Sequence, residues 1–179
     1  MAADARALVM GRIFGWANPA SEEDWDALYA EQLPRVYNFF RYRVGDGPEA
    51  EDLTAVTFQK AWQARHRYRR DLAAFATWLF TIARNVATDH WRRARPHAPL
   101  DEAADVASGD DPARDAERAS DLARLGRLLE GCSERERELV ALRYGAGLTH
   151  RAIARLTGLT ESNVGTILHR TVADLRARW

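Results

Sequence analysis

The sequence is poor in cysteine, in lysine and in long apolar runs. Cys132 is its one cysteine, which excludes a disulfide framework and a metal cluster held by several thiolates. Lys60 is the one lysine among 26 basic residues, an arginine bias typical of a GC-rich genome. No apolar run resembles a membrane span, and Asp4 and Arg12 interrupt the first 20 residues, so we expect neither a signal peptide nor insertion into a membrane. These absences favour a cytoplasmic protein.

Patterns typical of enzymes and metal sites are also missing. The five histidines have no metal-ligand spacing with carboxylates or thiols. No phosphate-binding loop and no nucleophile constellation is present. Glu134, Glu136 and Glu138 alternate with arginines, a pattern that we interpret as a solvated helix face and not as an acid–base pair. The sequence therefore predicts no enzyme, no catalytic residue, no metal and no cofactor.

The absence of net charge hides blocks of alternating sign. Residues 1–59 carry a net charge of −5 and residues 60–96 carry +7. Residues 97–121 carry −6, and residues 122–179 carry +4. Two basic blocks separated by an acidic one are typical of two contacts with a polyanion, joined by a tether.

Helical periodicity and turn signals predict an all-α fold of two small helical domains. Residues 1–20 show no clear period and are interpreted as an N-terminal extension. Residues 21–96 are predicted to form an N-terminal helical bundle. Residues 97–120 contain almost no large apolar side chain, so they are predicted to be a flexible acidic linker. Residues 121–179 are predicted to form a C-terminal helix-turn-helix domain.

Capping and breaking residues set the expected helix ends. Pro34 lies inside the first predicted helix and is expected to kink or split it. Pro48 fits the first position of the next helix, and Gly158 is expected to stop a helix in the C-terminal domain. The predicted N-caps are Ser21, Asp71, Ser133, Thr149 and Thr160.

The predicted helix over residues 75–95 carries an unusual second face. Opposite its apolar stripe, Phe80 and Trp91 lie among arginines such as Arg84. Aromatic side chains interleaved with arginine suit melted or single-stranded nucleic acid, whose bases can stack. Packing of the two rings under a neighbouring helix is the alternative, and the pattern leaves both open. The apolar stripe itself consists of Phe75, Trp78, Leu79, Ile82, Ala83 and Val86.

The C-terminal pattern of a short helix, a tight turn and a longer helix predicts a helix-turn-helix. Gly158 lies in the turn, and Ala152 is small where the two helices must approach each other. The pattern is typical of duplex DNA binding, although a three-helix fold without DNA binding stays open. The expected core residues are Ile153, Leu156, Leu159, Val164 and Ile167.

Three stretches resemble the bacterial RNA polymerase sigma factors of the extracytoplasmic-function (ECF) group. Residues 50–62, which begin A-E-D-L-T-A, resemble the helix that binds the polymerase clamp. Residues 77–93, which begin T-W-L-F-T-I-A-R-N, resemble the helix that melts and reads the −10 promoter element. Residues 133–144 and the helix-turn-helix ending at residues 168–170 resemble the −35 reader. The resemblance covers residues 22–179 in the family's order.

The resemblance implies a sigma factor that binds core RNA polymerase at its clamp and flap regions. Such a factor directs the polymerase to promoters, captures bases of the melted non-template strand and assists strand opening. An anti-sigma protein is a further expected partner. The implied polymerase contacts are Glu51, Asp52, Thr54, Phe58 and Gln59. The implied −10 contacts are Arg65, His66, Arg67, Phe80, Arg84, Asn85, Asp89, Trp91, Arg92 and Arg93. The implied −35 contacts are Glu161, Ser162, Asn163, Thr166, His169 and Arg170.

The resemblance also implies a span for the linker. The two promoter elements are about two helical turns apart, on the order of 70 Å. A relaxed coil of the linker's length spans about 27 Å, so we expect the linker to be largely extended in the complex.

Val56, Gly165 and Ile167 depart from the family pattern. Val56 stands where the family usually has a carboxylate in the clamp-binding helix, so one polymerase contact is expected to be missing. Gly165 and Ile167 stand where relatives commonly carry basic residues, which predicts a weaker or unusual −35 contact.

Two other functions stay open from the sequence alone. One is a stand-alone helix-turn-helix transcriptional regulator that binds duplex DNA as a dimer. That function gives no reason for aromatic rings among the arginines of residues 75–95. The other is a sigma-like scaffold that sequesters an anti-sigma factor, in which the three departures would be damage.

Overall fold

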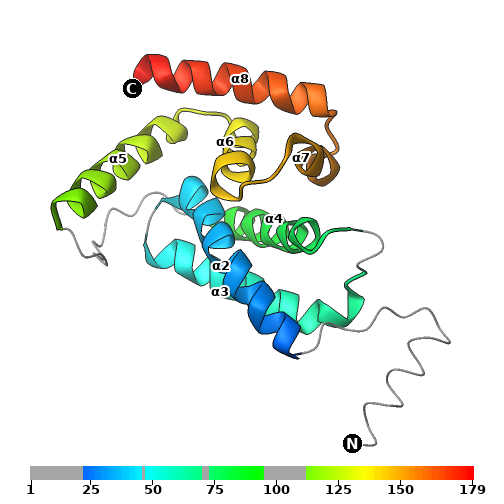
Figure 1. Cartoon of the computed structure of the whole chain (residues 1–179). Helices are drawn as coiled ribbons and strands as arrows, with labels where there is room; N and C mark the ends of the chain where they lie inside the picture. Colours follow the sequence, from blue (N-terminus) through cyan, green and yellow to red (C-terminus); the bar gives the residue numbers. More distant parts are fainter. Residues whose placement is uncertain (1–21, 46, 70–72, 95–111) are drawn as a thin grey trace, which may run out of the picture.

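The computed structural model describes residues 22–45, 47–69, 73–94 and 112–179. Every regular element in these ranges is helical, as the fold class predicted (Figure 1). No helix in the described part of the chain is long and apolar enough to cross a membrane. The elements are α2 (Glu22–Val44), α3 (Pro48–Ala64), η1 (Arg65–Arg67), α4 (Phe75–Ala94), α5 (Pro112–Glu130), α6 (Glu134–Val140), η2 (Ala141–Gly145), α7 (His150–Thr157) and α8 (Glu161–Arg178).

Helices α2, α3 and α4, with the 3₁₀ turn η1, form one packed group that we call the N-terminal unit. Phe39 and Phe40 of α2, Phe58 of α3 and Leu79 of α4 are buried between the helices. Pro48 occupies the first turn of α3, as predicted. Pro34 lies inside α2, which runs through it as one helix and is not split. The predicted caps Ser21 and Asp71 lie outside the described residues.

The predicted linker is partly helical. Helix α5 begins at Pro112, nine residues before the predicted start of the second domain, so the expectation that residues 112–120 are flexible is wrong. Proline is favoured at the first position of a helix, and the alanine, arginine and glutamate that follow are strong helix formers. The lack of large apolar residues excluded a core in this segment, but it did not exclude a helix. The remaining predicted linker, residues 97–111, lies outside the described ranges.

Helices α5 to α8 and η2 form a second group, the C-terminal unit, whose predicted caps are confirmed. Ser133 and Glu136 make a reciprocal capping box at the start of α6. The side chains of Thr149 and Thr160 accept hydrogen bonds from backbone N–H groups in the first turns of α7 and α8. Gly158 ends α7 with a left-handed φ of 74°, a conformation that favours glycine. These caps fix where α6, α7 and α8 begin and where α7 ends.

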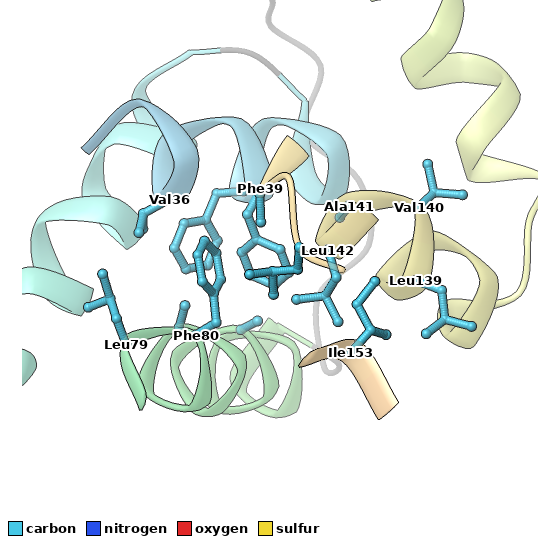
Figure 2. Packing of buried hydrophobic residues seen from close by; sticks show 14 of the residues in the cluster. Val36, Phe39, Leu79, Phe80, Leu139, Val140, Ala141, Leu142 and Ile153 are labelled. Atoms are coloured by element: carbon cyan, nitrogen blue, oxygen red, sulfur yellow. The ribbon is translucent and has the colours of Figure 1, made fainter. Parts of the chain in front are cut away.

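The two units pack against each other. Turn η2 packs on α2, and α7 packs on α4. Figure 2 shows Phe39 and Phe80 of the N-terminal unit beside Leu142 and Ile153 of the C-terminal unit. All four side chains are fully buried in one continuous apolar cluster.

The backbone of η2 lies directly against the backbone of α2, with no side chain between them. A Cβ atom added to Gly145, in the π-helical turn η2, would lie only 2.8 Å from the carbonyl oxygen of Asn38 on α2. The π-helical turn carries Gly145 onto α2, where only glycine fits without a shift.

Candidate nucleic-acid and polymerase-binding surfaces

Helix α8 presents all of its predicted −35 residues to solvent. Thr160 caps the helix, so the first turn of α8 is ordered and its N-terminal side chains point outward. Glu161 is held by Arg151 of α7, whose Nε lies 2.8 Å from the carboxylate. Gly165 lies beneath His150, so α7 and α8 approach closely at that point. The exposed residues are Glu161, Ser162, Asn163, Thr166, His169 and Arg170.

Helix α4 presents only part of its predicted −10 set. Asn85, Arg92 and Arg93 are exposed. Asp89 is half-buried and accepts a hydrogen bond from Arg92 at 3.1 Å. It also lies 3.6 Å from Lys60 of α3, so its carboxylate is positioned by cations on both sides. These side chains form a mixed acidic and basic surface along one face of α4.

Arg84, in the middle of the predicted −10 set, is covered by the C-terminal unit. Its Nε donates to a carboxylate oxygen of Glu138 at 2.8 Å. Its Nη1 donates to the carbonyl of Leu156 at the end of α7. The interpretation of residues 134–138 as a solvated face is therefore wrong for Glu138, whose side chain is only 21% exposed.

The two aromatic rings of the predicted −10 set differ. Phe80 is fully buried and packs edge-to-face on Phe39, so the packing alternative, and not base stacking, describes this side chain. It is buried because α2 and the C-terminal unit cover the face of α4 that the sequence assigned to nucleic acid. Trp91 is half-buried, and its ring lies 4.1 Å from the guanidinium carbon of Arg43.

The predicted base-capturing loop lies directly after α3. Arg65 stacks its guanidinium 3.8 Å over the ring of Trp62 and donates to the Trp62 carbonyl. His66 and Arg67 are exposed in the 3₁₀ turn η1. Arg65 is thus held in place, while its two neighbours extend into solvent.

The predicted polymerase contacts on α3 divide into surface and core. Glu51, Asp52 and Gln59 are exposed. Thr54 and Phe58 are buried, so their prediction as direct surface contacts is wrong for this conformation. Phe58 packs edge-to-face on the ring of Tyr29 of α2. Thr54 lines an open groove of about 410 Å³ between α2 and α3, together with Tyr29, Leu33, Pro34, Tyr37, Glu51 and Ala55. Val56 is exposed beside Glu51 and Asp52 on the same helix.

Arg43 is a functional candidate that the sequence interpretation missed. Its side chain is 4% exposed, and it lies 3.5 Å from Glu138 and 3.6 Å from Glu134. Burial lowers the pKa of Arg43 to about 10, an effect opposed by the two carboxylates, so the guanidinium stays charged at neutral pH. The missed signal was spacing: Arg43 follows Val36 by seven residues and Phe39 by four, so it continues the buried face of α2.

Arg35 makes a further contact between the units. Its Nε donates to the carbonyl of Ala146 at 2.8 Å. Arg35, Arg43 and Arg84 therefore all donate to or pair with the C-terminal unit. In the described part of the chain, no group of three or more His, Cys, Asp or Glu side chains is placed to hold a metal ion.

Family comparisons match both units in the order of the chain. Residues 28–97 match the family model for sigma-70 region 2. Residues 122–175 match the model for sigma-70 region 4. The two matched ranges correspond to the N-terminal and C-terminal units.

The chain is similar in sequence to several RNA polymerase sigma factors. The chain is 30% identical over 178 residues to the ECF RNA polymerase sigma factor BldN of Streptomyces coelicolor, which covers 97% of this chain and 67% of BldN. It is 34% identical over 143 residues to the ECF RNA polymerase sigma factor RpoE of Cereibacter sphaeroides, which covers 80% of this chain and 77% of that protein.

Solved structures share the fold. Sigma factor RpoE from Bartonella quintana, in complex with the anti-sigma factor NepR, superposes with a TM-score of 0.66 at 22% identity and covers 87% of this chain and 96% of that one. CnrH, in complex with the cytosolic domain of CnrY, superposes with a TM-score of 0.60 at 24% identity and covers 88% of each chain.

Proposed function

The chain belongs to the ECF group of sigma factors, and from this premise we propose which of its surfaces bind core RNA polymerase and which bind promoter DNA. The protein is a transcription initiation factor that directs RNA polymerase to promoters, and it is not an enzyme. The protein therefore acts by binding, first to the polymerase and then to two DNA elements.

The groove between α2 and α3 receives the polymerase clamp. Glu51 and Asp52 supply exposed carboxylates in the first turns of α3, and Gln59 supplies an exposed amide further along the helix. Thr54 and Phe58 support this surface from beneath. Val56 offers an apolar contact where the family usually has a carboxylate, so this polymerase contact depends less on salt than a charged one would.

Helix α4 and turn η1 bind the melted non-template strand at the −10 element. Asn85 and Asp89 carry side chains that can read base edges, whereas Arg92 and Arg93 contact phosphates. Trp91 supplies a ring for stacking on a base. His66 and Arg67 in η1 capture a flipped base beside Arg65, and Arg84 joins the phosphate contacts once it is uncovered. Phe80 supports α4 from the core.

Helix α8 enters the major groove at the −35 element. Its N-terminal residues Glu161, Ser162 and Asn163 contact base edges, as in other helix-turn-helix proteins, and Arg170 contacts the backbone. Thr166 and His169 lie one and two turns further along the same exposed face. The C-terminal unit also contacts the flap region of the polymerase.

An anti-sigma protein is a further partner, and the cytoplasm is the site of action. The sigma factor RpoE from Bartonella quintana, which shares this fold, was solved in complex with the anti-sigma factor NepR. Binding of polymerase and promoter DNA by this chain requires the compartment that holds both.

The observation that carries the proposal is that α4 and α8, in units that match sigma-70 regions 2 and 4, both present exposed side chains of the types that contact nucleic acid. The test is run-off transcription by purified core polymerase on genomic fragments, including the region upstream of the gene itself. Initiation at discrete sites only with this chain present is expected. Duplex binding without any polymerase binding would favour a stand-alone regulator, and capture of an anti-sigma protein without initiation would favour a scaffold.

A further inference from the structure

Five aromatic side chains gather where the start of α2, the last turn of α3 and the first turn of α4 meet. The ring of Trp25 lies edge-to-face on Trp62 at a centroid distance of 5.2 Å and on Phe75 at 5.8 Å. Tyr68, directly after η1, lies 5.4 Å from Phe75 and 5.3 Å from Trp78. The turn that is proposed to capture a base is thus anchored to one aromatic cluster on both sides, by Trp62 before it and by Tyr68 after it.

Trp62 holds the guanidinium of Arg65 in two ways. The guanidinium carbon lies 3.8 Å from the centre of the Trp62 ring, and Nη1 donates to the Trp62 carbonyl at 2.8 Å. A cation at this distance is attracted by the electron-rich face of the indole. A mobile arginine loses rotamer freedom when it binds a ligand, but Arg65 has already lost it on folding. Its guanidinium is therefore preorganised, whereas His66 and Arg67 of the same turn extend into solvent.

The stacked guanidinium keeps donors for a ligand. The indole covers one of its faces, and the group is not enclosed, because Arg65 is only half-buried. Arginine carries five N–H donors, and the Trp62 carbonyl takes one of them. A planar cation held in this way can stack on a flipped base or donate to the edge of that base.

Both kinds of contact favour guanine. Guanine has the most electron-rich ring system of the four DNA bases, so it stacks most favourably on a cation. Its edge carries the O6 and N7 acceptors that match the paired N–H donors of arginine. Adenine and thymine lack two adjacent acceptors. Cytosine has them in O2 and N3, but it offers a smaller and less electron-rich ring for stacking.

We propose that the base captured at turn η1 is a guanine held on Arg65, and that Trp62 is the positioning residue that presents the Arg65 guanidinium to it. The inference rests on the proposed function of η1 in the capture of a flipped base from the melted non-template strand. It adds the identity of that base. It also gives a role in promoter recognition to Trp62, which acts through Arg65 and does not itself contact DNA.

Variants of the full chain separate the charge of Arg65 from its shape. Arg65→Lys keeps the positive charge but removes the planar donor fork. Its control, Arg69→Lys, makes the same change at an exposed position four residues further along. Trp62→Leu removes the ring beneath Arg65, and Trp62→Phe restores an aromatic face there. Trp25→Leu is the packing control, because it removes a neighbouring ring of the same cluster and leaves the Trp62 ring in place.

The measurement is the base preference of the captured position. Fluorescence anisotropy gives the affinity for labelled single-stranded thymidine 12-mers that carry guanine, adenine, cytosine or thymine at one central position. Each variant is measured as the full chain alone and assembled with core polymerase. The readout is the ratio of the affinity for the guanine probe to the affinity for the all-thymine probe. A merely structural loss weakens binding of both probes alike and leaves this ratio unchanged.

We expect the ratio to be about ten in the wild type, within the range for one base-reading side chain. Arg65→Lys should bring it close to one. Trp62→Leu should reduce it by about threefold, the effect of losing one cation–π contact. Trp62→Phe, Trp25→Leu and Arg69→Lys should keep most of it. Circular dichroism establishes that each variant is folded, and Arg65→Lys tests the base preference without any change in the aromatic cluster.

The results separate this inference from the sigma function itself. A wild-type ratio of one, or a preference for another base, would overturn the capture of guanine by Arg65. A ratio that survives Trp62→Leu unchanged would overturn the positioning role of Trp62. Run-off transcription at discrete sites with a ratio of one would leave the sigma function standing and remove only the inference. Conversely, a guanine preference of the chain alone without any initiation would overturn the function proposed for η1 at promoters, not the contact between Arg65 and guanine.

Discussion

Helices α4 and α8 are both proposed to read DNA, but the fold treats them differently. Helix α8 lies on the outside of the C-terminal unit, and its six predicted readers are all exposed (Figure 1). Helix α4 is covered along one face by its own unit and along part of the other by α7. Arg84 is paired and Phe80 is buried as a result. The residues predicted to contact DNA therefore form an exposed surface on α8, whereas on α4 some of them pack against other helices.

The difference shows that accessibility of a reader helix is a property of the whole chain. The predicted readers of α8 can bind duplex DNA without the loss of any contact within the protein. For α4, binding also requires that Glu138 and Leu156 leave Arg84. Changes on α8 should thus affect one equilibrium, whereas changes on α4 should affect two.

The largest expected effect comes from removing two proposed phosphate contacts of α4 together, the covered Arg84 and the exposed Arg93. The double variant Arg84→Ala, Arg93→Ala should reduce promoter opening by about a hundredfold, if each lost contact weakens binding by about tenfold. The slope of binding against salt concentration should also become shallower by about two contacts. Permanganate footprinting of the melted strand and salt titrations measure these changes. Unchanged opening would remove α4 from the mechanism.

The single variants sharpen the comparison within α4. Arg93 is exposed, so Arg93→Ala should reduce DNA binding alone. Arg84→Ala should reduce DNA binding and also loosen the contact between the units.

A change on α8 should weaken duplex binding without a change in opening. Asn163→Ala removes an exposed amide from the first turn of α8, while its backbone N–H keeps the cap to Thr160. We expect binding to a −35 duplex to weaken by about 1–3 kcal/mol, the range for one base-reading side chain. Electrophoretic mobility shifts with the polymerase complex measure the binding, and strand-opening rates at saturating polymerase serve as the control. A slower opening rate at saturation would contradict the separation of roles.

A smaller effect is expected at the cap of α6, which carries Glu138. Ser133→Ala should lower the free energy of unfolding by about 1 kcal/mol, because it removes one half of the capping box. Hydrogen bonds from Ser133 lower the pKa of Glu136 below its ordinary value of 4.5. A carboxyl whose pKa is lowered by folding stabilises the fold above its unfolded pKa and loses that contribution as the pH falls through the folded value. Urea unfolding should therefore show a larger loss at pH 7 than at pH 3, and an equal loss at both would contradict the cap.

The smallest expected effect is a gain in stability at Gly165. A Cβ atom there would lie 3.6 Å from the ring of His150, an ordinary contact distance. Gly165→Ala should thus raise the free energy of unfolding by about 0.5–1 kcal/mol, because alanine is the better helix former. Gly158→Ala is the matched contrast, since its φ of 74° makes alanine strained, and it should lower stability. Thermal unfolding of the two variants measures the difference, and destabilisation by Gly165→Ala would mean that α7 and α8 cannot adjust.

Local signals in the sequence predicted the fold well. Capping residues, turn glycines and apolar periodicity located α3, α4, α7 and α8 to within one or two residues. These features are determined by neighbours along the chain, so a one-dimensional pattern contains them. The helical residues 112–120 were missed because a segment without large apolar side chains can still form a helix when its residues have high helix propensity.

The contacts between the units could not be predicted in the same way. Phe80, Arg43 and Glu138 each have a partner more than 35 residues away in the sequence. Periodicity reports that a face is apolar or charged, but it does not report which face of another helix will cover it. The predicted readers are thus all exposed where a helix has one packed face, as on α8. The prediction of an exposed ring failed at Phe80, because α4 is packed on two faces.

The meeting of Gly145 with Asn38 takes place within a single polypeptide, and this has a consequence for dosage. An intramolecular contact forms at an effective concentration fixed by the chain and not by the number of molecules in the cell. Raising expression multiplies packed and separated molecules equally and leaves their ratio unchanged.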